Sequence, residues 1–200
     1  ENKMAKRLML LAAALCVALA IGAPALAQDN NSPSAQALAF LVTLQNEDGG
    51  FSNGFAPESD IAATADAVVA AVAAGEDPNA FLTGEMMNPL TFLGTQVAGG
   101  NVAGAGPVAK VLIAVAAVGK DTAAFAGHDL VADLLALQGE DGLFGMGAFD
   151  HCLAVIALQN AGAALPDGAI AVLLGQQDAE GGWGLMAGEA PDTNTTALCI

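Results

Sequence analysis

A seven-residue pattern, Gln-x-x-x-Gly-x-aromatic, recurs along the chain without gaps. Its three full copies are Gln45–Gly49–Phe51, Gln138–Gly142–Phe144 and Gln177–Gly181–Trp183, and a weaker copy, Gln96–Gly100–Val102, has valine in the aromatic place. Successive Gln residues are 51, 42 and 39 residues apart. Internal periods of this length are typical of repeat proteins, in which each unit buries its apolar face only against its neighbours. The pattern therefore predicts an array of four stacked units.

Each unit is predicted to be a helical hairpin. Apolar residues with helical spacing precede each Gln, and a second apolar segment follows each loop. Ser59 or Asp60 can cap the first of these following segments, and Pro107, Asp150 and Asp192 are expected to open the others. The predicted following helices cover 61–74, 108–118, 151–161 and a stretch that begins after Asp192. Sustained period-two alternation and tyrosine are both absent, so strands have little support and the fold class is all-α.

The loop motif has a structural interpretation. A Gln at a helix end can bond free backbone groups of the next helix, and Gly49, Gly142 and Gly181 allow the chain to turn with positive φ. The aromatic ring can then cover the junction between the helices. A ligand-stacking role for Trp183 is the less favoured alternative.

The N-terminal segment has the features of a secretory signal peptide. Lys6 and Arg7 precede an apolar run, and Ala25-Leu26-Ala27 forms a small-residue cleavage site. A membrane anchor would need about 20 continuous apolar residues, and this run is interrupted by Gly22 and Pro24. We therefore predict a signal peptide at 4–27, a short linker at 28–33 and a repeat domain at 34–200. The protein is expected to be secreted, periplasmic or on the cell surface, with no stable membrane span after processing.

The charge of the processed chain excludes several partners. Once the leader is removed, only Lys110 and Lys120 oppose 20 acidic residues, so the net charge is near −18. Such a surface repels a phosphate backbone, which excludes nucleic acids and disfavours anionic membranes. The charge is interpreted as keeping an alanine-rich surface soluble, and an acidic site for a cationic partner is the alternative. Export permits disulfides, but Cys152 and Cys199 are too few for a dense framework.

These repeats resemble those shared by triterpene cyclases, protein prenyltransferase β subunits and cobalamin carriers of the transcobalamin type. The resemblance covers most of 34–200 and implies an α/α toroid, a partial α6/α6 barrel that continues beyond Ile200. In that fold, ligands lie in a central cavity at the N-terminal ends of the inner helices. The candidate cavity residues are therefore Asp60, Asp150, His151, Cys152, Asp192 and Thr195.

The catalytic motif of the cyclases is altered in this sequence. Their Asp-x-Asp-Asp-Thr-Ala motif corresponds to Asp192-Thr-Asn-Thr-Thr-Ala197, where Asn194 stands in the place of the proton-donating aspartate. An amide has no proton to donate at any working pH, so general-acid chemistry is lost there. Asp192 is accordingly interpreted as a helix N-cap.

The zinc site of the prenyltransferases is also incomplete. Asp150 and Cys152 resemble the Asp-x-Cys ligand pair, but Thr195 stands where the histidine ligand is expected, and His151 is too close to both partners for easy tetrahedral geometry. The favoured interpretation is an Asp150 cap, a small apolar Cys152 and a surface His151. No cofactor is predicted, and zinc and cobalamin enter only through the resemblance.

Two functions follow as hypotheses. The first is an exported, non-catalytic toroid that binds a small molecule or a protein partner in its cavity or on its rim. The alternative is an isoprenoid enzyme, of the terpene cyclase or prenyltransferase type, whose catalytic residues lie beyond residue 200. Export favours the first, because isoprenoid diphosphates are cytoplasmic and need Arg and Lys, and the processed chain has no Arg and only two Lys.

Overall fold

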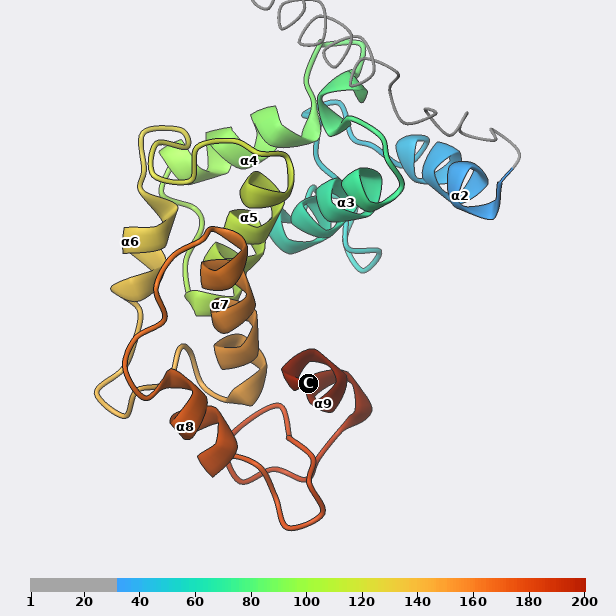
Figure 1. The fold of residues 1–200 in the computed structure, drawn as a ribbon. Helices are drawn as coiled ribbons and strands as arrows, with labels where there is room; N and C mark the ends of the chain where they lie inside the picture. Colours follow the sequence, from blue (N-terminus) through green and yellow to red (C-terminus); the bar gives the residue numbers. More distant parts are fainter. Residues whose placement is uncertain (1–31) are drawn as a thin grey trace, which may run out of the picture. The chain divides into compact units, whose positions relative to one another are not determined.

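The computed structural model describes residues 32–200, so the predicted signal peptide lies outside the described residues. Contacts divide the chain into two units, 1–36 and 37–200, and the second contains nearly all of the described helices (Figure 1). Within 32–200 the regular structure is helical, with isolated β-bridges and no strand, which confirms the all-α class. The helices are α2 (Pro33–Val42), α3 (Ile61–Ala73), the 3-10 turn η1 (Pro78–Ala80), α4 (Pro89–Ala98), α5 (Ala105–Ala117), α6 (Leu130–Leu135), α7 (Ala148–Asn160), α8 (Ala169–Gly175) and α9 (Thr193–Cys199).

The helix starts follow the capping rules only in part. Asp60 caps α3 by accepting from the backbone N–H of Ala63 at 2.8 Å, and Asp192 caps α9 in the same way. α5 and α7 instead begin after Gly104 and Gly147, with no side-chain cap. The predictions that Pro107 and Asp150 open these helices were therefore wrong, because both residues lie inside the first turn.

The second helices of the hairpins form a row in which α5 packs between α3 and α7, and α7 also contacts α9 (Figure 1). Gly106, the second residue of α5, lies against Asp150, the third residue of α7, so α5 and α7 run parallel. Asp66 of α3 and Lys110 of α5 form an ion pair at 2.5 Å. Val111, Leu112 and Val115 of α5 are fully buried in the middle of this row. The helices that precede the motif loops, α4, α6 and α8, pack against the member of the row before them in the chain, α3, α5 and α7 respectively. The prediction that each helix pairs mainly with the helix after its own loop was therefore wrong.

The three full motif copies form the same loop. In each, the Gln side-chain Nε2 donates to the carbonyl of the Gly four residues later, at 2.8–2.9 Å. All three glycines have positive φ, as predicted, and all three aromatic side chains are buried. The Gln therefore closes its own loop, and the prediction that it bonds the next helix was wrong. The residues are Gln45, Gly49 and Phe51, Gln138, Gly142 and Phe144, and Gln177, Gly181 and Trp183.

The weaker copy is built differently. Gln96 lies inside α4 rather than after it, and its backbone carbonyl accepts from the N–H of Asn101 at 2.9 Å. Its side-chain Oε1 also accepts from Asn101 Nδ2 at 3.0 Å. This is a tight helix ending, stabilised by Gly100 with positive φ, and it is not a structural copy of the other loops.

Candidate functional site

In each of the three full motifs, the backbone N–H of the aromatic residue donates to the side chain of the fourth residue of the helix after the loop. The backbone N–H of Phe51 donates to Thr64 Oγ1 at 2.9 Å, and that of Trp183 donates to Thr196 Oγ1 at 3.0 Å. In α7 the equivalent position is His151, whose Nδ1 accepts from the backbone N–H of Phe144 at 3.2 Å. Sequence reasoning missed this relationship, although counting from the true helix starts would have revealed it.

His151 is fully buried, so its interpretation as a surface residue was wrong. Its Nδ1 accepts from Phe144, and this assigns the proton to Nε2, which donates to the carbonyl of Ala169 at 2.9 Å. Both ring nitrogens are thus occupied by main-chain partners. The ring joins the loop before α7 to the start of α8 and is not available as a metal ligand.

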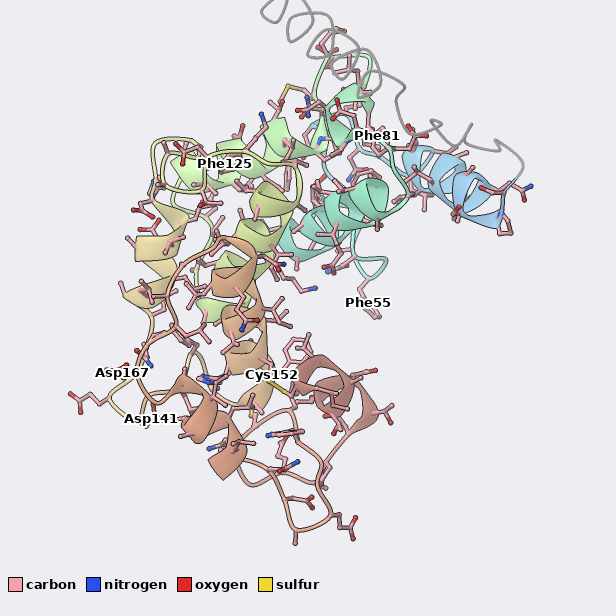
Figure 2. The ribbon with its side chains drawn as sticks, in the orientation of Figure 1. Phe55, Phe81, Phe125, Asp141, Cys152 and Asp167 are labelled. Atoms are coloured by element: carbon pink, nitrogen blue, oxygen red, sulfur yellow. A yellow bond between two sulfur atoms is a disulfide. The ribbon has the colours of Figure 1, made fainter. Side chains whose placement is uncertain are left out.

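Cys152 is also engaged, because it forms a disulfide with Cys199 that joins α7 to α9 (Figure 2). The bond lies in a small apolar cluster with Ala148, Leu173 and Trp183. Trp183 donates from Nε1 to the carbonyl of Leu173 at 2.9 Å, which gives this ring a structural role. In the disulfide form the sulfur of Cys152 cannot serve in the weak metal pair with Asp150.

Asp150 is the third residue of α7 and is half-buried. A Cβ on Gly106 of α5 would lie 2.5 Å from its Oδ1, and a Cβ on Gly145 would clash with the same side chain. The glycines therefore make room for this carboxylate between neighbouring segments. Across residues 32–200, no three His, Cys, Asp or Glu side chains are grouped to hold a metal ion.

Asp192 and Thr195 form a helix cap. Asp192 Oδ1 accepts from the backbone N–H of Thr195 at 2.9 Å, and its Oδ2 accepts from the Thr195 hydroxyl at 2.7 Å. The Thr195 side-chain hydrogen bond, and then the backbone one, lower the pKa of Asp192 below its ordinary value. Thr195 is buried and Asn194 is exposed. The interpretation of Asp192 as an N-cap is confirmed.

Asp60 lines a pocket of about 840 Å³, here called the α3 pocket, whereas Asp192 lines a smaller pocket of about 430 Å³. The floor is the alanine face of α3, and Leu41 and Leu44 contribute from the preceding segment. The loop after Phe51 supplies the other side and continues to Phe55, which projects from its tip and is 98% exposed (Figure 2). The lining residues are Leu41, Leu44, Phe51, Ser52, Asn53, Gly54, Asp60, Ala62, Ala63, Asp66, Ala67 and Ala70.

The ionised groups that line the α3 pocket are two carboxylates. Asp60 Oδ1 is used by its cap, whereas Oδ2 has a single long contact, 3.4 Å from Asn53 Nδ2. Asp66 is paired with Lys110 of α5. No Lys, Arg or His lines this pocket. Its electrostatics therefore favour a cation and oppose an anion.

Sequence reasoning did not identify the α3 pocket, apart from Asp60. Leu41 and Leu44 belong to the apolar segment that precedes Gln45, and Leu44 is half-exposed. The available signal was in α3, where small residues and Asp66 recur with helical spacing at 62, 63, 66, 67 and 70. Such a face cannot fill the space beside its helix, and the space becomes an open pocket where Leu41, Leu44 and the loop after Phe51 border it.

Comparisons with protein-family models, with curated proteins and with solved structures give no match for this chain. In the described part, no helix is long and apolar enough to cross a membrane. His151, Cys152, Asp192 and Thr195 are all engaged in structural contacts. The α3 pocket is therefore the candidate site, since its walls are apolar and one of its carboxylate oxygens retains acceptor capacity.

Proposed function

We propose that this chain is an exported, non-catalytic binding protein that holds a small molecule in the α3 pocket. We further propose that it belongs to the toroid superfamily its repeats resemble, and that the row of α3, α5, α7 and α9 is the inner layer of an α/α toroid. The direct packing between successive members of this row supports that arrangement. The outward pairing of α4, α6 and α8 with single members of the row supports it as well.

The α3 pocket is the observation that carries the binding role. Small-molecule sites are concave, mostly apolar and about 300–1,000 Å³ in volume, with a few polar groups that orient the ligand. The α3 pocket, at about 840 Å³, has this size and composition. It also adjoins the N-terminal end of a helix in the proposed inner layer, where ligands bind in the toroid fold that the repeats imply.

A binding role is favoured over isoprenoid chemistry because the candidate catalytic and zinc-binding residues are used in structural contacts. Asp192 is hydrogen-bonded through both carboxylate oxygens as a cap, and the neighbouring Asn194 cannot donate a proton. The Cys152–Cys199 disulfide removes the thiolate that a zinc site would need. The same bond supports export, since disulfides persist mainly in oxidising compartments.

The test is a thermal-shift screen of the complete exported chain with apolar small molecules, including cobalamin, because a ligand of the folded state raises its melting temperature. Ala70 is exposed and lines the α3 pocket, so Ala70→Trp should fill the pocket and abolish the shift. Ala73 is exposed on the same helix outside the pocket, and Ala73→Trp is the matched control. A ligand shift that survives Ala70→Trp would reject this site, and turnover of squalene or prenyl diphosphates would reject the non-catalytic role.

A further inference from the structure

We infer that the α3 pocket selects amphiphilic cations, molecules that join an ammonium group to an aliphatic chain. This inference rests on the proposed binding function and names the ligand class of the same pocket. It depends on three properties of the site: the acceptor capacity of Asp60, the length of the apolar floor, and the absence of any basic side chain in the lining.

The ammonium group is placed at Asp60. An ionised carboxylate can accept about four hydrogen bonds. Asp60 Oδ1 accepts from Ala63 at 2.8 Å, and Oδ2 has only the 3.4 Å contact with Asn53. The second carboxylate, Asp66, already has Lys110 as its counter-ion. Asp60 is therefore the lining carboxylate that retains an uncompensated charge for an incoming cation.

A free helix N-terminus would favour an anion instead, but the carboxylate of Asp60 already caps the start of α3. The N–H of Ala63 donates to the Asp60 carboxylate, and the N–H of Thr64 donates to the Asp60 carbonyl at 3.0 Å. The carboxylate of Asp60 thus occupies the place that a ligand anion would take. No basic side chain of the lining offsets it.

The apolar part of the ligand is placed along α3. Asp60 and Ala70 both line the pocket, and ten residues of α-helix span about 15 Å. Ala63, Ala67 and Ala70 give this floor no long side chain, and Leu44 contributes from the preceding segment. An eight-carbon chain attached to an ammonium group at Asp60 is short enough to lie within this length.

The experiment uses three eight-carbon probes that differ in the head group: octylamine, octanol and octanoate. Binding to the complete exported chain is measured by titration calorimetry at neutral pH, where octylamine is protonated. We expect octylamine to bind and octanoate not to bind. The affinity for octylamine should fall as the salt concentration rises, because the ion pair with Asp60 is partly exposed and is screened by salt.

Asp60→Asn tests the head group without removing the cap, because Asn is as good an N-cap as Asp. This variant should weaken octylamine binding about two- to fivefold, in the range of a partly exposed ion pair. Asp192→Asn makes the same change at the cap of α9, outside the α3 pocket, and should leave octylamine binding unchanged.

The outcomes separate this inference from the function on which it rests. If octanol or octanoate binds as well as octylamine, or Asp60→Asn has no effect, and Ala70→Trp still abolishes binding, cation selection is overturned and the pocket remains a binding site. If none of the three probes binds and the broader screen gives no ligand sensitive to Ala70→Trp, the proposed function fails as well.

Discussion

The imidazole of His151 takes the place that a threonine hydroxyl has in the other two full motif repeats, and accepts a hydrogen bond from the backbone N–H of Phe144. Because an imidazole is larger than a hydroxyl, the two groups make different contacts. The hydroxyls of Thr64 and Thr196 each contact only the residues around their own loop. The imidazole reaches further and donates to Ala169 at the start of α8. In this repeat, the buried His151 side chain therefore joins the motif loop to α8.

His151→Ala should lower the free energy of unfolding by about 3 kcal/mol. The change leaves the Phe144 N–H and the Ala169 carbonyl without their partner and opens a cavity in the core. His128 lies at the surface beside Asp133. His128→Ala should therefore lower the free energy of unfolding by less than about 0.5 kcal/mol. Urea denaturation of both variants measures the difference. Equal stability of the two would contradict the role assigned to His151.

Gly49→Ala should destabilise the protein by roughly 1–3 kcal/mol. Gly49 has a φ of 88°, and a Cβ there would lie 2.5 Å from the backbone oxygen of Asn88. Gly54 has nearly the same φ but open space around it, so Gly54→Ala isolates the conformational cost alone. The loss at Gly49 should exceed that at Gly54 in denaturant unfolding. The reverse order would show that the close approach to Asn88 contributes little.

Reduction of the disulfide should lower the free energy of unfolding by about 2–4 kcal/mol, since it releases a loop with a sequence separation of 47. Unfolding curves with and without dithiothreitol measure this loss. In Cys199→Ser there is no bond to reduce, so dithiothreitol should have no further effect. A thiol titration showing two free cysteines in the native exported protein would contradict the pairing.

Asp192→Asn should reduce the dependence of stability on acid pH. The Thr195 hydrogen bonds hold the pKa of Asp192 below its ordinary value in the folded state. Its contribution is therefore fully present above the unfolded pKa of about 4 and is lost as pH falls through the folded value. The wild type should lose more stability than the variant between about pH 5 and pH 2. Parallel pH profiles of the melting temperature would contradict this.

Export is tested separately from the fold. Fused ahead of a periplasmic reporter, residues 4–28 should direct secretion and be cleaved after Ala27, because a basic start, an apolar run and Ala25-Leu26-Ala27 form the recognised pattern. Mass spectrometry of the secreted reporter identifies the cleavage site. Replacing Ala25 and Ala27 by bulky residues should block cleavage, and an uncleaved cytoplasmic wild-type fusion would reject the prediction.

The sequence by itself determined the local features of this protein. Helical periods, the caps at Asp60 and Asp192, and the positive φ of Gly49 all depend on residues close together in the chain. The three motif loops could be aligned for the same reason, since each is closed by a hydrogen bond over four residues. The start of α7 was misplaced because Gly147 caps it without a side-chain signal.

Only the tertiary structure decided which side chains meet. Three features depend on contacts between segments that are separated in sequence. These are the buried contact of His151 with Ala169, the Cys152–Cys199 disulfide, and the α3 pocket, whose lining runs from Leu41 to Ala70. Asp60 and Asp192 both cap a helix, yet they line pockets of different volume, about 840 Å³ and about 430 Å³. The volume depends on which segments border each helix start, and this follows from packing between elements, which a local pattern does not specify.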